Sequence, residues 1–391
     1  MQNSSDTNRK NFSNDLVAIA FAVVGVLALL VVRAALFYNE WGDFSYFYGP
    51  WIIELRSKTF VEGLRSNVGN YNPMHMYIFN LIARTNINDL YIVKSVSVLF
   101  DFVIAFFSMK IVSLKTDSLN KQILAFLLAF AIPTVVLNSS MWGQCDSMYA
   151  AFAIGSLYFG LSGRSKSTYV FMALALSFKL QAVFVLPMLL VFVFMKKIRI
   201  HDCYLFFLVY FATLLPALLA GKPIGALLSV YLYQYDAFNS LNMNIVNVWQ
   251  FVGHVEYVYF RTAGLYIAGL AVLGLIYFTY VNRARLTSNL DYIRLAYLFA
   301  ILMPFLLPKM HDRYYIIADV LSVTVFLFDK RRWYVPIVSI FCSYLGYAYF
   351  LMSGVHLIDF RYAAIALMFV ILVILRDYVK SLYLSTDSDC E

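Results

Sequence analysis

The sequence predicts an all-α polytopic membrane protein, and both its composition and the pattern of its apolar residues indicate this fold class. Of the 391 residues, 62% are hydrophobic and only 13% are charged, whereas a soluble domain carries about 25% charged residues. The apolar residues form long runs, and the first, from Leu16 to Phe37, is long enough to cross a hydrocarbon core of about 30 Å. An ordinary cytosolic protein is therefore excluded, and basic residues that flank spans explain the net charge of +8 without a nucleic-acid partner.

Twelve apolar segments are expected to cross the membrane as helices. The stretch from Thr168 to Met195 supplies two of them, because Lys179 and Gln181 interrupt it near the middle. We therefore predict two short helices that meet at Lys179. The other segments cover about Leu16–Phe37, Leu90–Val112, Gln122–Asn138, Ser147–Leu161, Tyr204–Ala220, Ala263–Val281, Tyr292–Leu307, Tyr314–Phe328, Tyr334–Met352 and Tyr362–Leu375.

The lysines and arginines set the orientation. With twelve crossings the basic clusters all fall on one side, and the positive-inside rule places this side and both termini in the cytoplasm. A single crossing from Thr168 to Met195 would move the cluster at 196–199 to the other side, which is the weaker solution. The clusters are Arg9 and Lys10; Lys110, Lys115 and Lys121; Arg164 and Lys166; Lys196, Lys197 and Arg199; Arg283, Arg285 and Arg294; Lys330, Arg331 and Arg332; and Arg376 and Lys380.

Polar segments gather on the opposite, external side. Residues 38–89 form one large external loop, because the apolar piece Met74–Ala83 is too short to cross. Such a long loop is more than a connector, and carboxylates, amides, histidines and a cation on one face of an apolar bundle indicate a site. The external segments are Asn39-Glu40-Trp41-Gly42-Asp43, Gly69 to His75, Trp142-Gly143-Gln144-Cys145-Asp146-Ser147, Lys179-Leu180-Gln181, Asn242 to Trp249, and Lys309 to Tyr314.

Four of these places resemble a known family. They are Gly42-Asp43 after the first span; Pro133 with Asn138 and Trp142 to Ser147; Phe178-Lys179-Leu180-Gln181 with Pro187; and Met310-His311-Asp312-Arg313-Tyr314. In order and sidedness they resemble the GT-C glycosyltransferases, closest to the bacterial group related to the GPI-anchor mannosyltransferases. The resemblance implies a GT-C-type bundle, a polyprenyl-phosphate-linked sugar as donor, inversion at the anomeric carbon, and an essential acid in the first external loop.

The acid that matches is Asp43, and its chemical task is to remove the proton of an attacking acceptor hydroxyl. Glu40 is the rival for this role. Growing negative charge on the lipid phosphate requires a nearby cation or donor set, for which Lys179, His311 and Arg313 are the candidates. The remaining substrate-binding candidates are His75, Gln144, Asp146, Gln181 and Asn247.

Simpler explanations stand beside these assignments. Asp43 could be a solvated turn residue, Asp146 could cap the helix that starts at Ser147, and His311 and Arg313 could anchor the chain at the headgroups. No cofactor is expected: Asp43 and Asp146 supply only part of the ligand set that a divalent cation needs. The four cysteines contain no CxxC pair, so neither a zinc site nor a disulfide framework is indicated.

The resemblance divides the chain into five parts: a disordered cytoplasmic tail (1–15), a catalytic transmembrane module with the external loop 38–89 (16–221), an external amphipathic segment (222–261), C-terminal transmembrane helices (262–378) and a cytoplasmic tail (379–391). The expected function is transfer of a mannose- or glucose-type hexose to a glycan, lipid or protein acceptor, outside a bacterial plasma membrane, with membrane lipids as further partners. A twelve-span secondary transporter and a polysaccharide export or flippase component are the alternatives. The chain shows no repeated halves, which transporters of that kind usually have.

Overall fold

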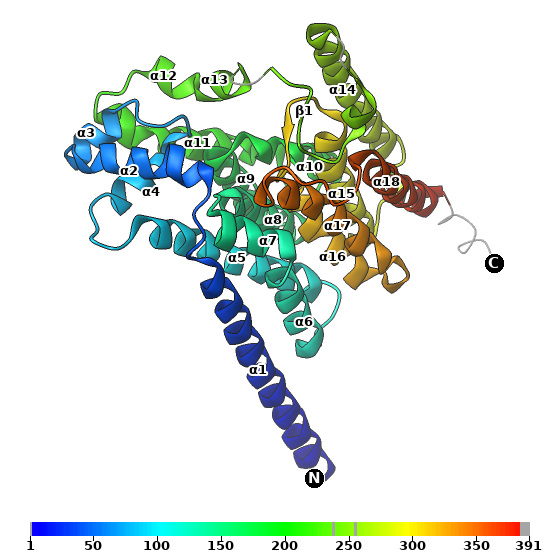
Figure 1. The fold of residues 1–391 in the computed structure, drawn as a ribbon. Coiled ribbons are helices and arrows are strands. Elements are labelled where there is room, and N and C mark those ends of the chain that lie inside the picture. The colour runs from blue at the N-terminus through cyan, green and yellow to red at the C-terminus, as the bar shows by residue number, and fades with distance from the viewer. Residues whose placement is uncertain (1, 237–238, 254–255, 384–391) are drawn as a thin grey trace.

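The fold is described by a computed structural model, which covers residues 2–236, 239–253 and 256–383. Over these residues the chain is helical apart from two short strands (Figure 1). The helices are α1 (Gln2–Leu36), α2 (Gly49–Arg56), α3 (Phe60–Arg65), α4 (Pro73–Ile82), α5 (Asp89–Ser113), α6 (Leu119–Phe130), α7 (Pro133–Val136), α8 (Asp146–Leu161), α9 (Ser165–Phe178), α10 (Pro187–Phe194), α11 (Tyr204–Leu219), α12 (Ile224–Leu228), α13 (Val230–Asp236), α14 (Tyr257–Val281), α15 (Asn289–Leu306), α16 (Ile316–Phe328), α17 (Tyr334–Leu351) and α18 (Phe360–Tyr383). The strands are β1 (Asn242–Met243) and β2 (Met310–His311), which pair in parallel.

Several helices are long and apolar enough to cross a membrane, so the chain is a multi-pass membrane protein. By length and composition the described residues contain seven such helices, or eight if the bent pair 119–130 and 133–142 counts as one span. The predicted count of twelve is therefore not reached. Helices α8, α9 and α16, at 16, 14 and 13 residues, extend only about 20–24 Å, less than the hydrocarbon thickness.

Each of these short helices has one end beside the same cavity, and this explains their length. The start of α8 at Asp146, the end of α9 at Phe178 and the start of α16 at Ile316 all adjoin one polar cavity, described below. A helix that stops at a cavity inside the bundle needs fewer turns than one that faces lipid, because non-helical backbone is tolerated where it lines such a cavity. The break at Lys179 has the same cause, and it lies where the sequence predicts it: Lys179 is extended (φ −149°, ψ 144°) between α9 and α10.

Helix α1 differs from the prediction at its beginning. The helix starts at Gln2, whereas the segment that could span a membrane is Asp15–Leu36, so residues 2–14 of the predicted tail precede the span. No glycine or proline stands between Gln2 and Val24, and asparagine and serine lower helix propensity by less than about 1 kcal/mol each. Figure 1 shows α1 running away from the rest of the molecule toward its N-terminal end.

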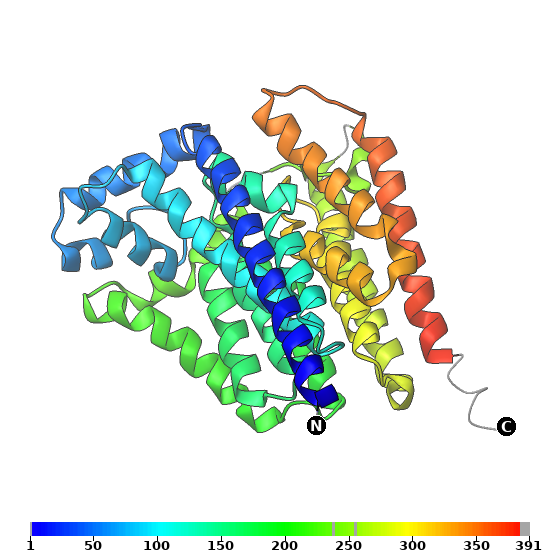
Figure 2. The same ribbon diagram turned by 90° about the horizontal axis from the view of Figure 1, so that it is seen from below.

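The basic loops come together at one end of the bundle. Figure 2 shows the first turn of α1 and the last turn of α18 at the same end. Contacts of basic side chains join the loops there: Arg285 donates to the Leu382 carbonyl (3.2 Å), Arg332 pairs with Asp377 (2.6 Å), Lys115 donates to the Leu327 carbonyl (3.4 Å), and Lys197 donates to the Leu161 carbonyl (3.3 Å) and lies over the Tyr292 ring (4.8 Å).

The external loop 38–89 is folded into short helices. It contains a π-helical turn, η1 (Phe44–Tyr48), followed by α2, α3 and α4. Helix α4 has ten residues and is therefore about 15 Å long, too short to cross. Figure 1 shows α2, α3 and α4 grouped at one side of the bundle, with α12 and α13 above them. Residues of η1, Trp51 of α2 and residues 70–71 supply one wall of the cavity, and Gln234 of α13, Ser240 and residues 242–244 supply another.

Candidate functional site

A polar cavity of about 500 Å³ opens at the end of the bundle that lies away from the basic loops. Helix α8 shows the separation: its first residue, Asp146, is bonded to residues that line the cavity, and its last, Leu161, is bonded to Lys197 in a basic loop. The volume lies within the range of about 300–1,000 Å³ that is usual for small-molecule sites. The described residues that form the walls are Asp43, Phe47, Tyr48, Trp51, 70–71, Trp142, 179–181, Gln234, Ser240, 242–244, 309–314 and Phe350.

Asp43 supplies a carboxylate to the cavity. Its Oδ2 atom accepts a hydrogen bond from the Trp142 indole (2.9 Å) and another from the Gln144 amide. The Gln144 amide is in turn oriented by Tyr48, whose hydroxyl donates to its Oε1 (3.0 Å). Both bonds go to one oxygen, and Oδ1 accepts none from the described residues. One oxygen is thus held in place while the other is left for a ligand.

The local fold explains how Trp142 and Gln144 reach the same carboxylate. The π-helical turn η2 (Leu137–Trp142) ends at Gly143, which has a left-handed conformation (φ +80°). Glycine adopts this conformation without a steric penalty. The chain then turns so that the backbone N–H of Gln144 donates to the Asn138 carbonyl (2.8 Å). The Trp-Gly-Gln sequence therefore places two side-chain donors on either side of a turn.

A buried aspartate organises the cationic part of the site. Asp146 has no exposed surface, and its Oδ1 lies 2.5 Å from Lys179 Nζ. Its Oδ2 lies 3.2 Å from Arg313 Nε and accepts a hydrogen bond from Asn138 (2.9 Å). Cys145, not Asp146, is the N-cap residue of α8, so the helix-capping explanation for Asp146 is wrong. Its role is to hold two cations at the cavity wall.

Lys179 and Arg313 together carry two positive charges, whereas the Asp146 carboxylate between them carries one negative charge. Lys179 lies over the Tyr71 ring (5.4 Å) and Arg313 over the Trp142 ring (5.2 Å), and both line the cavity. Arg313 Nη1 also lies 3.5 Å from Asp312 Oδ1. Burial raises the pKa of the Asp312 carboxyl to about 7, although Arg313 opposes the shift. Near neutral pH this carboxyl is therefore only partly ionised, and the group around Asp146 keeps positive charge.

His311 does not add a cation. Burial, together with the charges of Arg313 and Lys179, lowers the pKa of its imidazole to about 3. The ring is thus neutral at physiological pH, and it can donate or accept a hydrogen bond but cannot balance a phosphate. Of the three cation candidates that the sequence indicates, Lys179 and Arg313 remain.

The pair of strands β1 and β2 carries the third wall. The register joins Asn242 to Met310 and Met243 to His311, and the Asp312 amide donates to the Met243 carbonyl (3.1 Å). Two residues beside the strands, Asn244 and Lys309, have left-handed backbones with φ of 63° each and line the cavity. Such conformations in residues other than glycine cost free energy and often occur at functional sites.

Eight of the ten predicted site residues meet at this cavity. Asp43, Lys179, Gln181, His311 and Arg313 line it, while Gln144, Asp146 and Asn247 bond to lining residues from behind. Asn247 Oδ1 accepts hydrogen bonds from the Asn242 side chain (2.6 Å) and from the Trp249 backbone amide (3.1 Å). The other two are not among the described residues of the wall. Glu40 accepts from Ser45 (2.7 Å), and His75 is 2% exposed and packs with its ring centroid 4.5 Å from that of Phe79.

The structure adds residues that the sequence did not single out. Asp312 lies between two of the predicted residues, and Tyr71 lies inside a segment recognised as polar and external. Their positions were therefore indicated, but not their contribution. Tyr48 belongs to an aromatic run without any local signal. Its role depends on a hydrogen bond to a residue 96 positions later in the chain.

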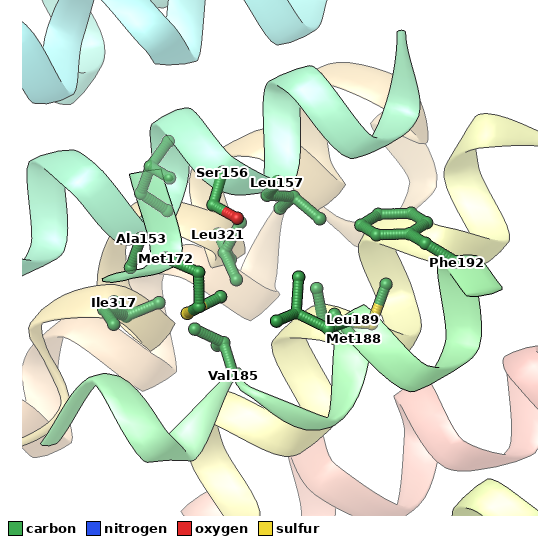
Figure 3. A pocket seen from close by; sticks show the side chains of 12 residues that line it. Ala153, Ser156, Leu157, Met172, Val185, Met188, Leu189, Phe192, Ile317 and Leu321 are labelled. Carbon is green, nitrogen blue, oxygen red and sulfur yellow. The ribbon is translucent and has the colours of Figure 1, made fainter. Parts of the chain in front are cut away.

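A second, smaller cavity lies in the apolar interior between α8, α9, α10 and α16. Its volume is about 10 Å³, enough for about one water molecule. Figure 3 shows its labelled side chains, of which only Ser156 is polar. The Ser156 hydroxyl already donates to the Thr168 carbonyl (2.8 Å). This cavity is a packing defect and not a ligand site.

Among the described residues, no group of three or more His, Cys, Asp or Glu side chains is arranged to hold a metal ion. In comparison with known proteins, no family model and no curated protein matches the chain.

Proposed function

We propose that this protein is an inverting glycosyltransferase that moves a hexose from a polyprenyl-phosphate sugar to a glycan, lipid or protein acceptor. One observation carries the proposal: the Asp43 carboxylate, whose Oδ1 accepts no hydrogen bond from the described residues, and two cations, Lys179 and Arg313, face the same cavity. Transfer from a sugar phosphate needs a base for the acceptor and positive charge for the leaving group. The cavity offers both.

In the proposed step, Asp43 Oδ1 takes the proton of the acceptor hydroxyl as its oxygen attacks the anomeric carbon. The new carbon–oxygen bond forms on the face opposite the breaking bond to phosphate, so the configuration inverts. The electron pair of the breaking bond goes to the phosphate oxygen, and polyprenyl phosphate leaves. A positioned base contributes about 10²- to 10⁴-fold to such a step. Oδ2 stays bonded to Trp142 and Gln144, which keeps the carboxylate in place.

Lys179 and Arg313 are suited to bind the phosphate. Asp146 fixes both cations but neutralises only one charge, so an anion that enters the cavity gains charge-assisted hydrogen bonds. In a buried site such preorganised charge stabilises the leaving group more than it would in water. Because the donor's isoprenoid tail remains in the bilayer, the cavity of a membrane bundle is a suitable place for its phosphate.

Neutral hydrogen-bonding groups surround these charges and support a sugar as the ligand. The side chains of Asn70, Gln181, Gln234, Asn242 and Asn244 line the cavity. Amide groups both donate and accept hydrogen bonds, which is what sugar hydroxyls require. Aromatic rings, among them Trp51 and Tyr71 with centroids 5.9 Å apart, provide apolar surface for a sugar ring.

The GT-C bundle of twelve helices belongs to the same proposal. Helical structure overlaps each of the twelve predicted segments, and the segment Gln122–Asn138 is divided between α6, α7 and η2. Twelve crossings put both termini and the basic loops in the cytoplasm, and the cavity then opens on the extracytoplasmic side. In this arrangement of a bacterial plasma membrane, the donor phosphate lies near the outer surface.

A transfer assay with purified protein in liposomes tests the function. A panel of polyprenyl-phosphate mannose and glucose donors is offered with glycan and lipid acceptors, and Asp43→Asn is compared with the wild type. We expect transfer by the wild type and a loss of at least about 10²-fold in kcat in Asp43→Asn. Glu40→Gln is the matched control, since Glu40 does not line the cavity, and it should keep full activity. Full activity in both variants would show that the catalytic assignment is wrong.

The same liposomes separate this function from the alternatives. Movement of a solute across the bilayer without any sugar transfer would favour a transporter. Movement of a lipid-linked glycan between leaflets, unaffected by Asp43→Asn, would favour an export or flippase component. The proposed enzyme instead forms a new glycosidic product on one side of the membrane.

A further inference from the structure

One face of α5 carries three buried polar residues that contact the segments around Asp43. Lys94, Ser97 and Asp101 are spaced by three and four residues, so they lie on one face of the helix, and none of the three has exposed surface. Polar side chains inside a membrane bundle are costly unless they are paired. All three have partners, and these partners belong to the segments that hold Asp43 and its two donors.

Lys94 binds the end of α1. Its ammonium donates to the carbonyls of Leu36 (3.3 Å), Phe37 (3.0 Å) and Asn39 (2.5 Å). The last carbonyls of a helix have no partner within the helix, so Lys94 satisfies the C-terminal end of α1 and the first residues of the loop. Asp43 follows four residues after Asn39. The ammonium therefore fixes the chain that leads into Asp43.

The same side chain also contacts the segment that donates to Asp43. A Cβ atom added to Gly143 would lie 3.4 Å from Lys94 Cε and 3.5 Å from Cγ. The methylenes of Lys94 thus pack against the glycine between Trp142 and Gln144. The Lys94 side chain therefore contacts both the segment that precedes Asp43 and the turn that carries the hydrogen-bond donors of Asp43.

The two residues below Lys94 hold the same two segments. The Ser97 hydroxyl donates to the Gln144 carbonyl (2.7 Å). Asp101 pairs with Arg33 of α1 (3.1 Å) and accepts a hydrogen bond from Ser139 of η2 (2.6 Å). Helix α5 is therefore the common support of the Asp43 segment and of the turn at 142–144.

We propose that Lys94 is a positioning residue, which sets the Asp43 carboxylate against Trp142 and Gln144 through the end of α1. Lys94 itself is not among the described residues that line the cavity, so it acts without touching substrate. The proposal rests on the proposed function, in which Asp43 is the base. Since displacement of a catalytic group by about 1 Å can cost about 10²-fold in rate, loss of Lys94 should lower kcat.

Three variants test the proposal in the transfer assay. Lys94→Met keeps the length of the side chain and removes the ammonium, and Lys94→Arg restores a cation with several donors. Lys110→Met is the matched control, because Lys110 lies on the same helix at its other end, where it contacts the Tyr158 ring (5.8 Å). We expect kcat to fall about 10- to 100-fold in Lys94→Met, with the KM for the donor within about twofold, and to recover partly in Lys94→Arg. Lys110→Met should behave as the wild type.

Hydrogen exchange gives a second measurement that does not depend on the reaction. In Lys94→Met the peptide that covers residues 37–48 should exchange at least about tenfold faster than in the wild type, and in Lys110→Met it should not. Faster exchange in a protein that transfers no sugar would support the positioning of the loop and count only against the proposed function. Wild-type exchange and wild-type kcat in Lys94→Met would overturn the inference, as would a raised donor KM with unchanged kcat, since Lys94 would then act on the substrate.

Discussion

Among single residues, Asp146 has the greatest influence on the charge of the cavity. It is buried, and it pairs with Lys179 at 2.5 Å and with Arg313 at 3.2 Å. Removal of one member of a buried pair leaves an uncompensated charge and costs about 3–5 kcal/mol. Here Lys179 would lose its ion-pair partner and Arg313 the nearer of its two, so Asp146→Asn should strongly lower the melting temperature in detergent.

The control for this prediction is an aspartate in an exposed pair. Asp359 lies 2.5 Å from Arg361, and their side chains are 38% and 61% exposed. Solvent screens such a pair, so Asp359→Asn should melt at the wild-type temperature. If Asp146→Asn melted within about 2 °C of the wild type, Asp146 would not be the residue that compensates the two cations.

Asp312 makes the stability of the protein depend on pH. Burial raises its pKa to about 7 in the folded protein, whereas an unfolded aspartate titrates near pH 4. Between these values the folded state keeps a proton that the unfolded chain has released. Stability should therefore fall as pH rises from about 4 to 7 and stay level above 7, by up to roughly 4 kcal/mol over the full window.

Thermal unfolding of Asp312→Asn at a series of pH values measures this contribution. Asparagine resembles the protonated carboxyl and does not titrate, so the variant should lose less stability than the wild type between pH 5 and pH 8. The difference between the two curves therefore measures Asp312 together with the charges that interact with it, chiefly Arg313. Parallel curves would contradict the assignment.

Asp43 shows which features of the site could be predicted from the sequence. Asp43 was predicted as a site residue from its position after the first span and from its Gly-Asp motif. Lys179 was predicted because it interrupts an apolar run. The donors to Asp43 could not be predicted, because Trp142 and Gln144 stand 99 and 101 residues later. Glu40 shows the opposite error: its external position was predicted, but a local bond to Ser45 occupies it away from the cavity. Asn247 lies behind the cavity wall, where it accepts a hydrogen bond from the lining residue Asn242.

At the scale of elements, close contact between α8 and α10 depends on Gly160. A Cβ atom at this position would lie 2.2 Å from the Phe192 ring. That ring is 1% exposed and stacks on Tyr292 with centroids 5.8 Å apart, so it cannot move aside. We expect Gly160→Ala to destabilise the protein by about 1–3 kcal/mol, the usual cost of overpacking.

The control is a glycine of α14 that faces outward. A Cβ atom at Gly269 would meet nothing within 4 Å, and alanine favours helix over glycine by up to about 1 kcal/mol. Gly269→Ala should therefore melt at or slightly above the wild-type temperature in detergent. Equal melting temperatures of the two alanine variants would show that the α8–α10 contact is looser than described.

Hydropathy patterns predict the long helices well but not the π-helical turns. Hydropathy located every long helix, since apolar runs report the solvent that a helix faces. It also marked the short helices α8, α9 and α16, whose ends adjoin the cavity, and their crossing of the membrane stays a prediction. It gave no sign of the π-helical turns η1 and η2, which position Asp43 and Trp142 and depend on tertiary contacts.

At the scale of the whole molecule, the charges divide the bundle into two ends. Basic loops meet at one end, through contacts such as Arg332 with Asp377, and the carboxylates and amides of the cavity meet at the other. This division is expected from the positive-inside rule, because translocation selects against lysine and arginine in short external loops. With the twelve crossings of the proposal, the cavity and the termini face different compartments.

Cysteine labelling tests this sidedness. Arg331 precedes α17 and its side chain is 82% exposed, and Val355 follows α17 and is 52% exposed. Each is replaced by cysteine in a background without the native cysteines. In intact cells a membrane-impermeant maleimide should label Val355→Cys only, and Arg331→Cys should react after permeabilisation. Labelling of Arg331→Cys alone would place the basic loops outside, and labelling of both from one side would show that α17 does not cross the membrane.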